Sequence, residues 1–161
     1  ANVNKGNAFI YGATLDLRLC TPNVWAFKAN LTYTLGCSVD SHHPLPSVSP
    51  LFVHLTLRYI VGKSSDFELS YRFSSSKNPD KYSIGGEDGL EETPVIFDGI
   101  DFSFNGMPSW GVVKLSSSYE FSNKFKTLLV LDNVFDIHYR EFASGISAPG
   151  RNLNLVLSYK F

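Results

Sequence analysis

The sequence predicts an all-β fold, in which this chain supplies about seven strands to an antiparallel transmembrane β-barrel. Apolar and polar side chains alternate with a period of two along most of the 161 residues. Each such segment would form a strand with one apolar and one polar face. No stretch approaches the roughly 20 consecutive apolar residues that a membrane-spanning helix needs. The intervals between the alternating segments are short and long in turn, which is typical of outer-membrane barrels.

The first four strands lie in the N-terminal half of the chain. They are expected at Phe9–Leu19, Trp25–Leu35, Leu51–Tyr59 and Phe67–Phe73. In each of them the odd-numbered side chains are mainly apolar and the even-numbered ones are mainly polar. Helical periodicity fits none of these segments, so we interpret them as strands with their odd-numbered side chains facing lipid.

The last three strands are expected at Trp110–Phe121, Phe125–Val134 and Leu153–Phe161. The second of these is less regular, because Leu128 to Leu131 are all apolar. The final strand carries apolar residues at every odd position up to the terminal Phe, and only Val156 interrupts its polar face. Proline cannot donate to a strand ladder, so its position between strands supports the assignment. All eight prolines lie there: Pro22, Pro44, Pro46, Pro50, Pro79, Pro94, Pro108 and Pro149.

The connections between these strands sort by length. The short ones are 20–24, 60–66 and 122–124, and the long ones are 36–50, 74–109 and 136–151. Short turns at one end and long loops at the other match the periplasmic and extracellular ends of an outer-membrane barrel.

Aromatic side chains cluster near both ends of the expected strands, as expected of belts at the two headgroup levels. Near the short turns lie Trp25, Tyr59, Phe67, Tyr119, Phe121, Phe125, Tyr159 and Phe161. Near the long loops lie Phe9, Tyr11, Tyr33, Tyr71, Phe73, Trp110 and Phe135.

Composition argues against several classes of function. The 14 basic and 15 acidic residues give a net charge of -1, whereas nucleic-acid binding needs a basic surplus. Cys20 and Cys37 lie at opposite ends of one expected hairpin, so two unpaired thiols are expected. The sequence contains no catalytic constellation, phosphate-binding loop or zinc pattern. We therefore expect no enzymatic activity, no cofactor and no metal site.

Seven strands do not close a barrel well, because single-chain bacterial barrels have an even number of strands. An open sheet in lipid would leave unpaired backbone groups at both edges. We therefore expect that residues 1–161 form the C-terminal part of a larger barrel. The remaining strands would come from upstream sequence, on a separate chain if an extracellular loop were cut before Ala1.

Several segments resemble TonB-dependent outer-membrane receptors. Residues 131–141 (LDNVFDIHYRE) resemble the family's N-L-F-D-x-x-Y segment, residues 148–152 (APGRN) resemble the P-G-R that opens its last strand, and residues 159–161 resemble its terminal Y-x-F. Residues 31–36 and the proline-marked loop at 44–50 resemble a T-Y-T strand and the loop after it. These matches follow the family's order and span nearly the whole chain.

The resemblance implies a 22-stranded barrel in the outer membrane of a Gram-negative bacterium, closed by an N-terminal plug domain. Such receptors import a scarce ligand, such as an iron-siderophore, haem, cobalamin or a glycan, with energy delivered through TonB. The implied partners are outer-membrane lipid, the upstream strands and plug, TonB acting through the plug, the barrel-assembly machinery and a small-molecule ligand. Residues 1–161 would contain neither the plug nor the TonB box.

Three groups of candidate functional residues follow. The ligand candidates lie near the extracellular mouth or in its loops: His42, His43, His54, Arg72, Lys114 and Asn152. The charges expected to face the plug inside the barrel are Arg18, Lys28, Arg58 and Glu68. The resemblance also implies that the terminal strand is a signal for barrel assembly, carried by Leu157, Tyr159 and Phe161.

The longest loop allows alternative interpretations. Its carboxylates are expected to form a solvated acidic surface, and a calcium site is the minor alternative. They are Glu87, Asp88, Glu91 and Glu92. Its aromatic residues are expected either to fold over a ligand or to pack into a small core of the loop. They are Tyr82, Phe97, Phe102 and Phe104.

Two other functions compete with active uptake. The chain could belong to a passive porin or barrel adhesin, completed by a further strand or by an oligomer. It could also form a soluble β-sandwich, in which the apolar faces of two sheets pack together.

Overall fold

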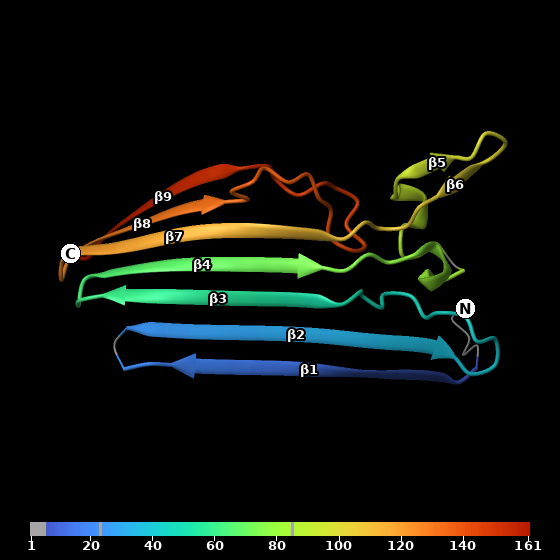
Figure 1. Ribbon diagram of the computed structural model, residues 1–161, viewed down its shortest axis with the longest axis horizontal. Coiled ribbons are helices and arrows are strands. Elements are labelled where there is room, and N and C mark those ends of the chain that lie inside the picture. Colours follow the sequence, from blue (N-terminus) through green and yellow to red (C-terminus); the bar gives the residue numbers. More distant parts are fainter. Residues whose placement is uncertain (1–5, 23, 85) are drawn as a thin grey trace.

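The computed structural model describes residues 6–22, 24–84 and 86–161, and it consists mainly of one antiparallel sheet with loops at one end (Figure 1). The strands of this sheet are β1 (Ala8–Cys20), β2 (Trp25–Ser38), β3 (Phe52–Val61), β4 (Ser65–Ser74), β7 (Trp110–Ser122), β8 (Phe125–Asp132) and β9 (Asn152–Tyr159). The predicted all-β class and all seven predicted strands are confirmed. The expectation of a break before Ala1 lies outside the described residues.

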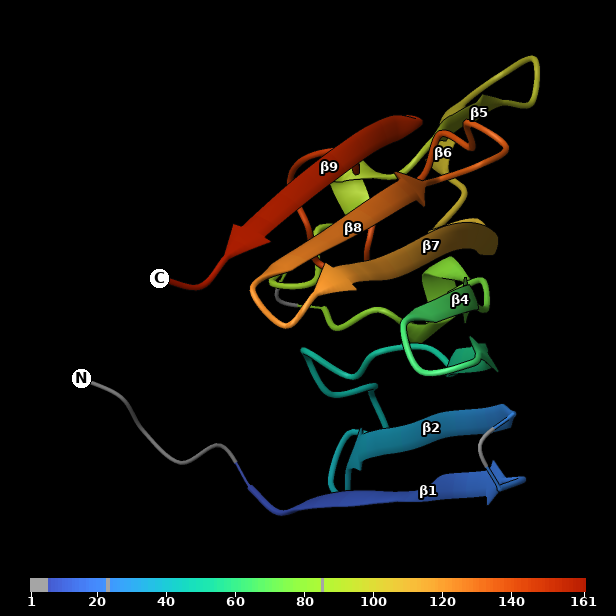
Figure 2. The same ribbon diagram turned by 90° about the vertical axis from the view of Figure 1, so that its left-hand side faces the viewer.

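Neighbouring strands of the sheet follow one another in the order β1-β2-β3-β4-β7-β8-β9. The sheet curves in cross-section like part of a cylinder wall, and its two edge strands do not meet (Figure 2). Within the described residues, β1 pairs only with β2, and β9 pairs only with β8. An open wall of this kind needs further strands on both edges before its backbone is satisfied in lipid.

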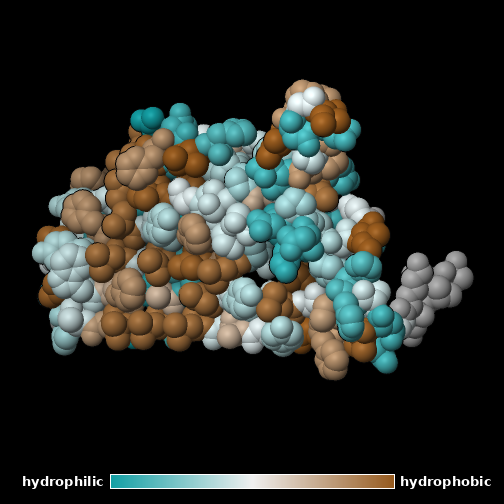
Figure 3. All heavy atoms as spheres, turned by 45° about the vertical axis from the view of Figure 1, so that its right-hand side comes forward, coloured by the Kyte–Doolittle hydropathy of each residue, from teal (hydrophilic) through white to brown (hydrophobic). Residues whose placement is uncertain are grey.

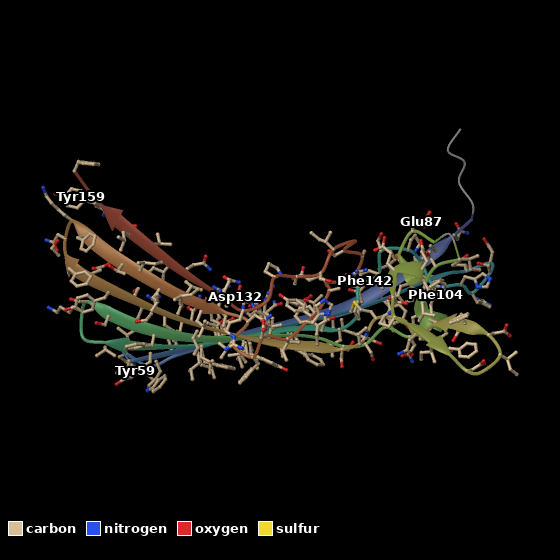
Figure 4. The ribbon with its side chains drawn as sticks, turned by 90° about the horizontal axis from the view of Figure 1, so that it is seen from above. Tyr59, Glu87, Phe104, Asp132, Phe142 and Tyr159 are labelled. Atoms are coloured by element: carbon tan, nitrogen blue, oxygen red, sulfur yellow. The ribbon has the colours of Figure 1, made fainter. Side chains whose placement is uncertain are left out.

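Odd-numbered residues pair with odd-numbered residues across the sheet, so their side chains share one face. This is the convex face, from which Tyr59 projects outward in Figure 4. Large hydrophobic side chains remain exposed there; Leu17 is 39% exposed and Leu157 is 61% exposed. Figure 3 shows hydrophobic residues gathered over the strands and hydrophilic residues at the loop end. Among the described residues the seven long strands form one sheet, and the other sheet has two strands of three residues each. The two packed sheets that the β-sandwich alternative requires are not formed, so that alternative is wrong.

Short turns lie at one end of the sheet and long loops at the other, as predicted (Figure 1). The longest loop, residues 75–109, contains two single-turn 3-10 helices, η1 (Pro79–Lys81) and η2 (Leu90–Glu92). It also contains a two-stranded hairpin, β5 (Val95–Phe97) and β6 (Phe102–Phe104), which the sequence did not predict. In the described parts of the chain, no helix has the length and apolar character needed to cross a bilayer.

Three sequence predictions need correction. Strand β8 ends at Asp132 and not at Val134, because Asn133 adopts a left-handed conformation with φ of 49°. Strand β9 ends at Tyr159, so Phe161 lies beyond the ladder with an exposed side chain. Trp110 does not join the outer aromatic belt, because it points to the concave face, where it is only 7% exposed.

Candidate functional site

A small hydrophobic core lies on the concave face near the long loops. Trp110 and Val112 project from β7, and Tyr139 covers them from the loop at 133–151. The rings of Trp110 and Tyr139 have centroids 4.4 Å apart. This stacking folds the loop back over the inner face of the sheet, as Figure 4 shows. The loop therefore narrows the space on the concave side at the long-loop end of the sheet.

Arg72 on β4 binds this loop from the sheet. Its Nη2 donates to the hydroxyl of Tyr139 at 2.9 Å, and its Nη1 donates to Oε1 of Glu141 at 3.2 Å. Its guanidinium also lies 6.0 Å from the ring centroid of Trp110. Arg72, predicted as a ligand residue, thus holds the loop that lines the cavity described below.

Two polar residues of the segment at 133–136 connect it to the segment at 149–151. The Asn133 side chain donates to the carbonyls of Ile137 at 2.9 Å and Pro149 at 3.2 Å, and its Oδ1 accepts from the backbone N–H of Ile137 at 2.9 Å. Asp136 Oδ1 accepts from the backbone N–H of Arg151 at 2.7 Å. The two side chains tie the start of the loop to its end, so the motif closes the loop.

Three long loops meet at the buried ammonium of Lys77. Its Nζ lies 3.0 Å from Oδ2 of Asp88 and donates to the carbonyl of Val48 at 2.8 Å. It also lies 4.0 Å from the ring centroid of Phe142, a cation–π distance. Oδ1 of Asp88 accepts from the backbone N–H of Ser47 at 2.6 Å. One buried ion pair therefore joins the loops at 39–51, 75–109 and 133–151.

Burial affects the protonation of this cluster. Desolvation lowers the pKa of Lys77, and the hydrogen bond and charge of Asp88 oppose that shift. Burial raises the pKa of the neighbouring Tyr82.

The expectation that Asp88 belongs to a solvated acidic surface is wrong, since the residue is only 3% exposed. Of the four loop aromatics, Tyr82 packs into the loop core, whereas Phe97, Phe102 and Phe104 remain exposed.

A cavity of about 310 Å³ lies between the loops at 75–109 and 133–151. Its lining combines aromatic and apolar surface with a few charged groups, including Tyr82, Met107, Trp110, His138, Tyr139, Arg140 and Glu92. Such a mixture is typical of small-molecule sites, whose volumes start near ~300 Å³. The buried Nε1–H of Trp110 has no hydrogen-bond partner among the described residues.

An interaction between the two loops borders this cavity. Arg140 Nη1 donates to the backbone carbonyl of Glu92 at 3.0 Å and lies 3.5 Å from its carboxylate Oε2. Both side chains are partly exposed. Neither residue takes part in the buried contacts of Lys77.

The remaining predicted ligand residues lie apart from this cavity. His42 and His43 are exposed in the loop at 39–51, and the carbonyl of His43 accepts from the backbone N–H of Ser38 at 2.9 Å. His54 on β3 is hydrogen-bonded to Ser70 Oγ at 2.9 Å. No group of three potential metal ligands occurs among the described residues. Ligand contact by these histidines stays a prediction.

Lys114 and Asn152 both lie on the concave side, but not in the cavity wall. Lys114 pairs with Ser70 across β4 and β7. Asn152 donates from its side chain to the carbonyl of Gly150 at 3.2 Å and accepts from Asn154 at 2.6 Å. Contact of either residue with a ligand stays a prediction.

The four predicted lumen charges form two cross-strand pairs on the concave face. Arg18 lies opposite Lys28, and Arg58 lies opposite Glu68. Arg58 also pairs with Asp66, with Nη2 2.9 Å from Oδ2. In the described part of the chain, no carboxylate forms an ion pair with Arg18 or Lys28. Contact with a plug domain stays a prediction.

The predicted assembly signal lies at the free edge of the sheet. Leu157 and Tyr159 are 61% and 58% exposed on β9, and the ring of Phe161 packs edge-on against Tyr159 with centroids 5.3 Å apart. The role of these residues in barrel assembly stays a prediction.

Sequence reasoning missed Lys77, Asn133 and Tyr139 as organisers of the loops. Their neighbours lie far apart in the chain, and no spacing rule links Lys77 to Val48 and Phe142. The motif at 131–141 marked Asn133 and Tyr139, but it did not reveal which groups they bind.

Solved structures share this fold. The copper transporter OprC matches with a TM-score of 0.74 at 21% identity, covering 96% of this chain and 24% of that one. The ferric enterobactin receptor PfeA from Pseudomonas aeruginosa, solved as a mutant, matches with a TM-score of 0.66 at 19% identity, covering 96% of this chain and 22% of that one. No protein-family model and no curated protein sequence matches the chain.

One of these neighbours is named as a copper transporter and the other as a ferric enterobactin receptor. The chain shares the antiparallel fold of the matching segment of these two structures. It spans about a quarter of the length of the chains it matches.

Proposed function

We propose that this chain forms the C-terminal part of the wall of a TonB-dependent outer-membrane receptor that actively imports a scarce ligand. The observation that carries the proposal is a curved, single-layer sheet with an apolar convex face, whose long loops fold inward over a polar concave face.

Arg18 and Lys28 support a plug inside the barrel. Like charges directly opposite each other in a sheet destabilise it, and neither residue has an acidic partner within the described residues. An acidic segment of a plug domain would relieve this repulsion. TonB would then act on the receptor through that plug.

The cavity beside Trp110 is the best candidate for ligand contact in this segment. It offers aromatic surface and the charged pair of Arg140 and Glu92. Its volume of about 310 Å³ suits one ring or side arm of a ligand. The classes we propose are iron-siderophore, haem, cobalamin and glycan, and the names of the two neighbours add copper.

Uptake by whole cells tests this function. Cells that express the intact receptor would be given labelled ferric enterobactin, cupric ion, haem or cobalamin, with and without a functional TonB. We expect saturable uptake of one probe that is lost without TonB. Uptake that rises linearly with concentration and does not require TonB would favour the passive porin, and surface attachment without uptake would favour an adhesin.

A further inference from the structure

The convex face carries a hollow of about 470 Å³ in the half of the sheet nearer the short turns. Its wall is almost entirely apolar and is formed by outward side chains from β2 to β9, among them Trp25, Leu57, Tyr59, Phe67, Leu115, Leu129 and Leu153. The hollow therefore lies between the outward side chains of neighbouring strands.

Strand register explains the hollow. Leu57, Leu69, Leu115, Leu131 and Leu153 are paired successively across five strands and form one continuous row. In the next row toward the short turns, Phe67 pairs with Ser117, and Ser117 pairs with Leu129. Phe67 is 52% exposed and Leu129 is 43% exposed, so both stand above the small serine between them.

The position of the hollow indicates its depth in a bilayer. At one end the stacked rings of Trp25 and Tyr59 have centroids 4.4 Å apart. Tyr119, Phe121 and Phe125 lie beyond it toward the short turns, with ring centroids of neighbours 4.6 and 5.3 Å apart. Aromatic side chains of this kind lie at headgroup level in membrane barrels. The hollow therefore lies at the depth of the acyl chains, next to the headgroup level at the short-turn end of the sheet.

Charge at this end of the sheet fits a phosphate. Lys63 lies in the turn between β3 and β4, and Lys124 lies in the turn between β7 and β8. Both are exposed, and neither forms an ion pair within the described residues. Tyr and Trp rings at this level also offer polar atoms to the ester region of a lipid.

We propose that this hollow binds one glycerophospholipid, with an acyl chain above Ser117 and its phosphate near the lysines of the short turns. An apolar groove in a bilayer does not hold water, and an empty one would forfeit dispersion contacts along its walls. A chain that follows the groove gains those contacts on several sides, whereas a chain on the smooth leucine rows gains them on one side. The bound lipid would therefore exchange more slowly than its neighbours.

Native mass spectrometry of the intact receptor in mild detergent, titrated with phosphatidylglycerol, tests this site. Ser117→Leu fills the hollow, and we expect it to weaken the tightest phosphatidylglycerol site at least tenfold. Thr127→Leu is the matched control, because Thr127 also lies on the convex face, opposite Tyr119 and Leu157, but does not line the hollow. Both substitutions add apolar bulk to a lipid-facing position, so neither should impair folding.

Equal affinity of Ser117→Leu, Thr127→Leu and the parent receptor for phosphatidylglycerol would overturn the proposal. A receptor dimer that Ser117→Leu dissociates, with no change in lipid binding, would also overturn it, because the hollow would then be a protein contact. A tenfold loss confined to Ser117→Leu would support it.

Discussion

Lys77 and Asp88 form a buried ion pair, with Nζ 3.0 Å from Oδ2 and with side chains only 5% and 1% exposed. The pair lies where three long loops converge, and each partner also bonds the backbone of a neighbouring loop. A buried charge is stable only while its partner and hydrogen bonds remain in place. The loops therefore behave as one unit and not as three independent segments.

Lys77→Met should loosen all three loops together. It leaves the Asp88 carboxylate buried without its counter-ion, which costs about 3–5 kcal/mol. Hydrogen exchange of the intact receptor would show faster exchange at 39–51, 75–109 and 133–151, with the strands as internal reference. Lys81→Met is the control, because its pair with Asp80 is exposed on both sides and costs at most about 1 kcal/mol. Equal effects of the two variants would refute the claim that the Lys77–Asp88 ion pair joins the three loops.

The stability of this cluster should rise with pH between the lowered pKa of Lys77 and the ordinary lysine pKa of about 10.4. Burial lowers the pKa of Lys77, so the unfolded loops bind more protons than the folded loops above that lowered pKa. The free energy of unfolding therefore increases with pH until the ordinary lysine value is passed. Burial raises the pKa of Tyr82, so stability falls again where free tyrosine ionises. Resistance of the loops to protease across this range measures the effect, and Lys77→Met should remove the rising part.

Asn133→Ala should open the loop at 133–151 without affecting the sheet. The substitution removes the side-chain bonds to Ile137 and Pro149, each worth about 1 kcal/mol. It also places alanine at a positive φ of 49°, which asparagine tolerates better. Faster proteolytic cleavage within the loop is the expected result. Asn152→Ala, which loses only exposed hydrogen bonds, should be cleaved at the same rate as the parent protein.

Tyr139→Phe should weaken ligand binding several-fold and leave the fold intact. It removes the hydroxyl that accepts from Arg72, a loss of about 1 kcal/mol, and so relaxes one wall of the cavity. The dissociation constant of whichever probe the receptor imports provides the measurement. Glu120→Gln, at the short-turn end of the concave face, should bind normally. Unchanged binding by Tyr139→Phe would exclude this cavity as a ligand contact.

The sequence predicted the strands well because lipid and water impose a simple period of two on each one. Leu55 and Thr56 differ in polarity for that reason, and no long-range information is needed to see it. The loops were less predictable, since their partners come from distant segments. Lys77 is an ordinary loop lysine in the sequence, but three loops surround it in the fold. Trp110 was wrongly placed in an outer belt because its residue type was weighted above its even position in the strand.

Spin-label accessibility in a lipid bilayer tests the central claim most directly. Labels at Leu55→Cys and Thr56→Cys would be placed in the intact receptor after Cys20 and Cys37 are changed to serine. These neighbours lie on opposite faces of β3. The label at 55 should collide mainly with oxygen dissolved in lipid, and the label at 56 should collide mainly with a water-soluble nickel complex. Equal accessibility of both positions to the nickel complex, or protection of position 55 from both reagents, would contradict a wall between lipid and water.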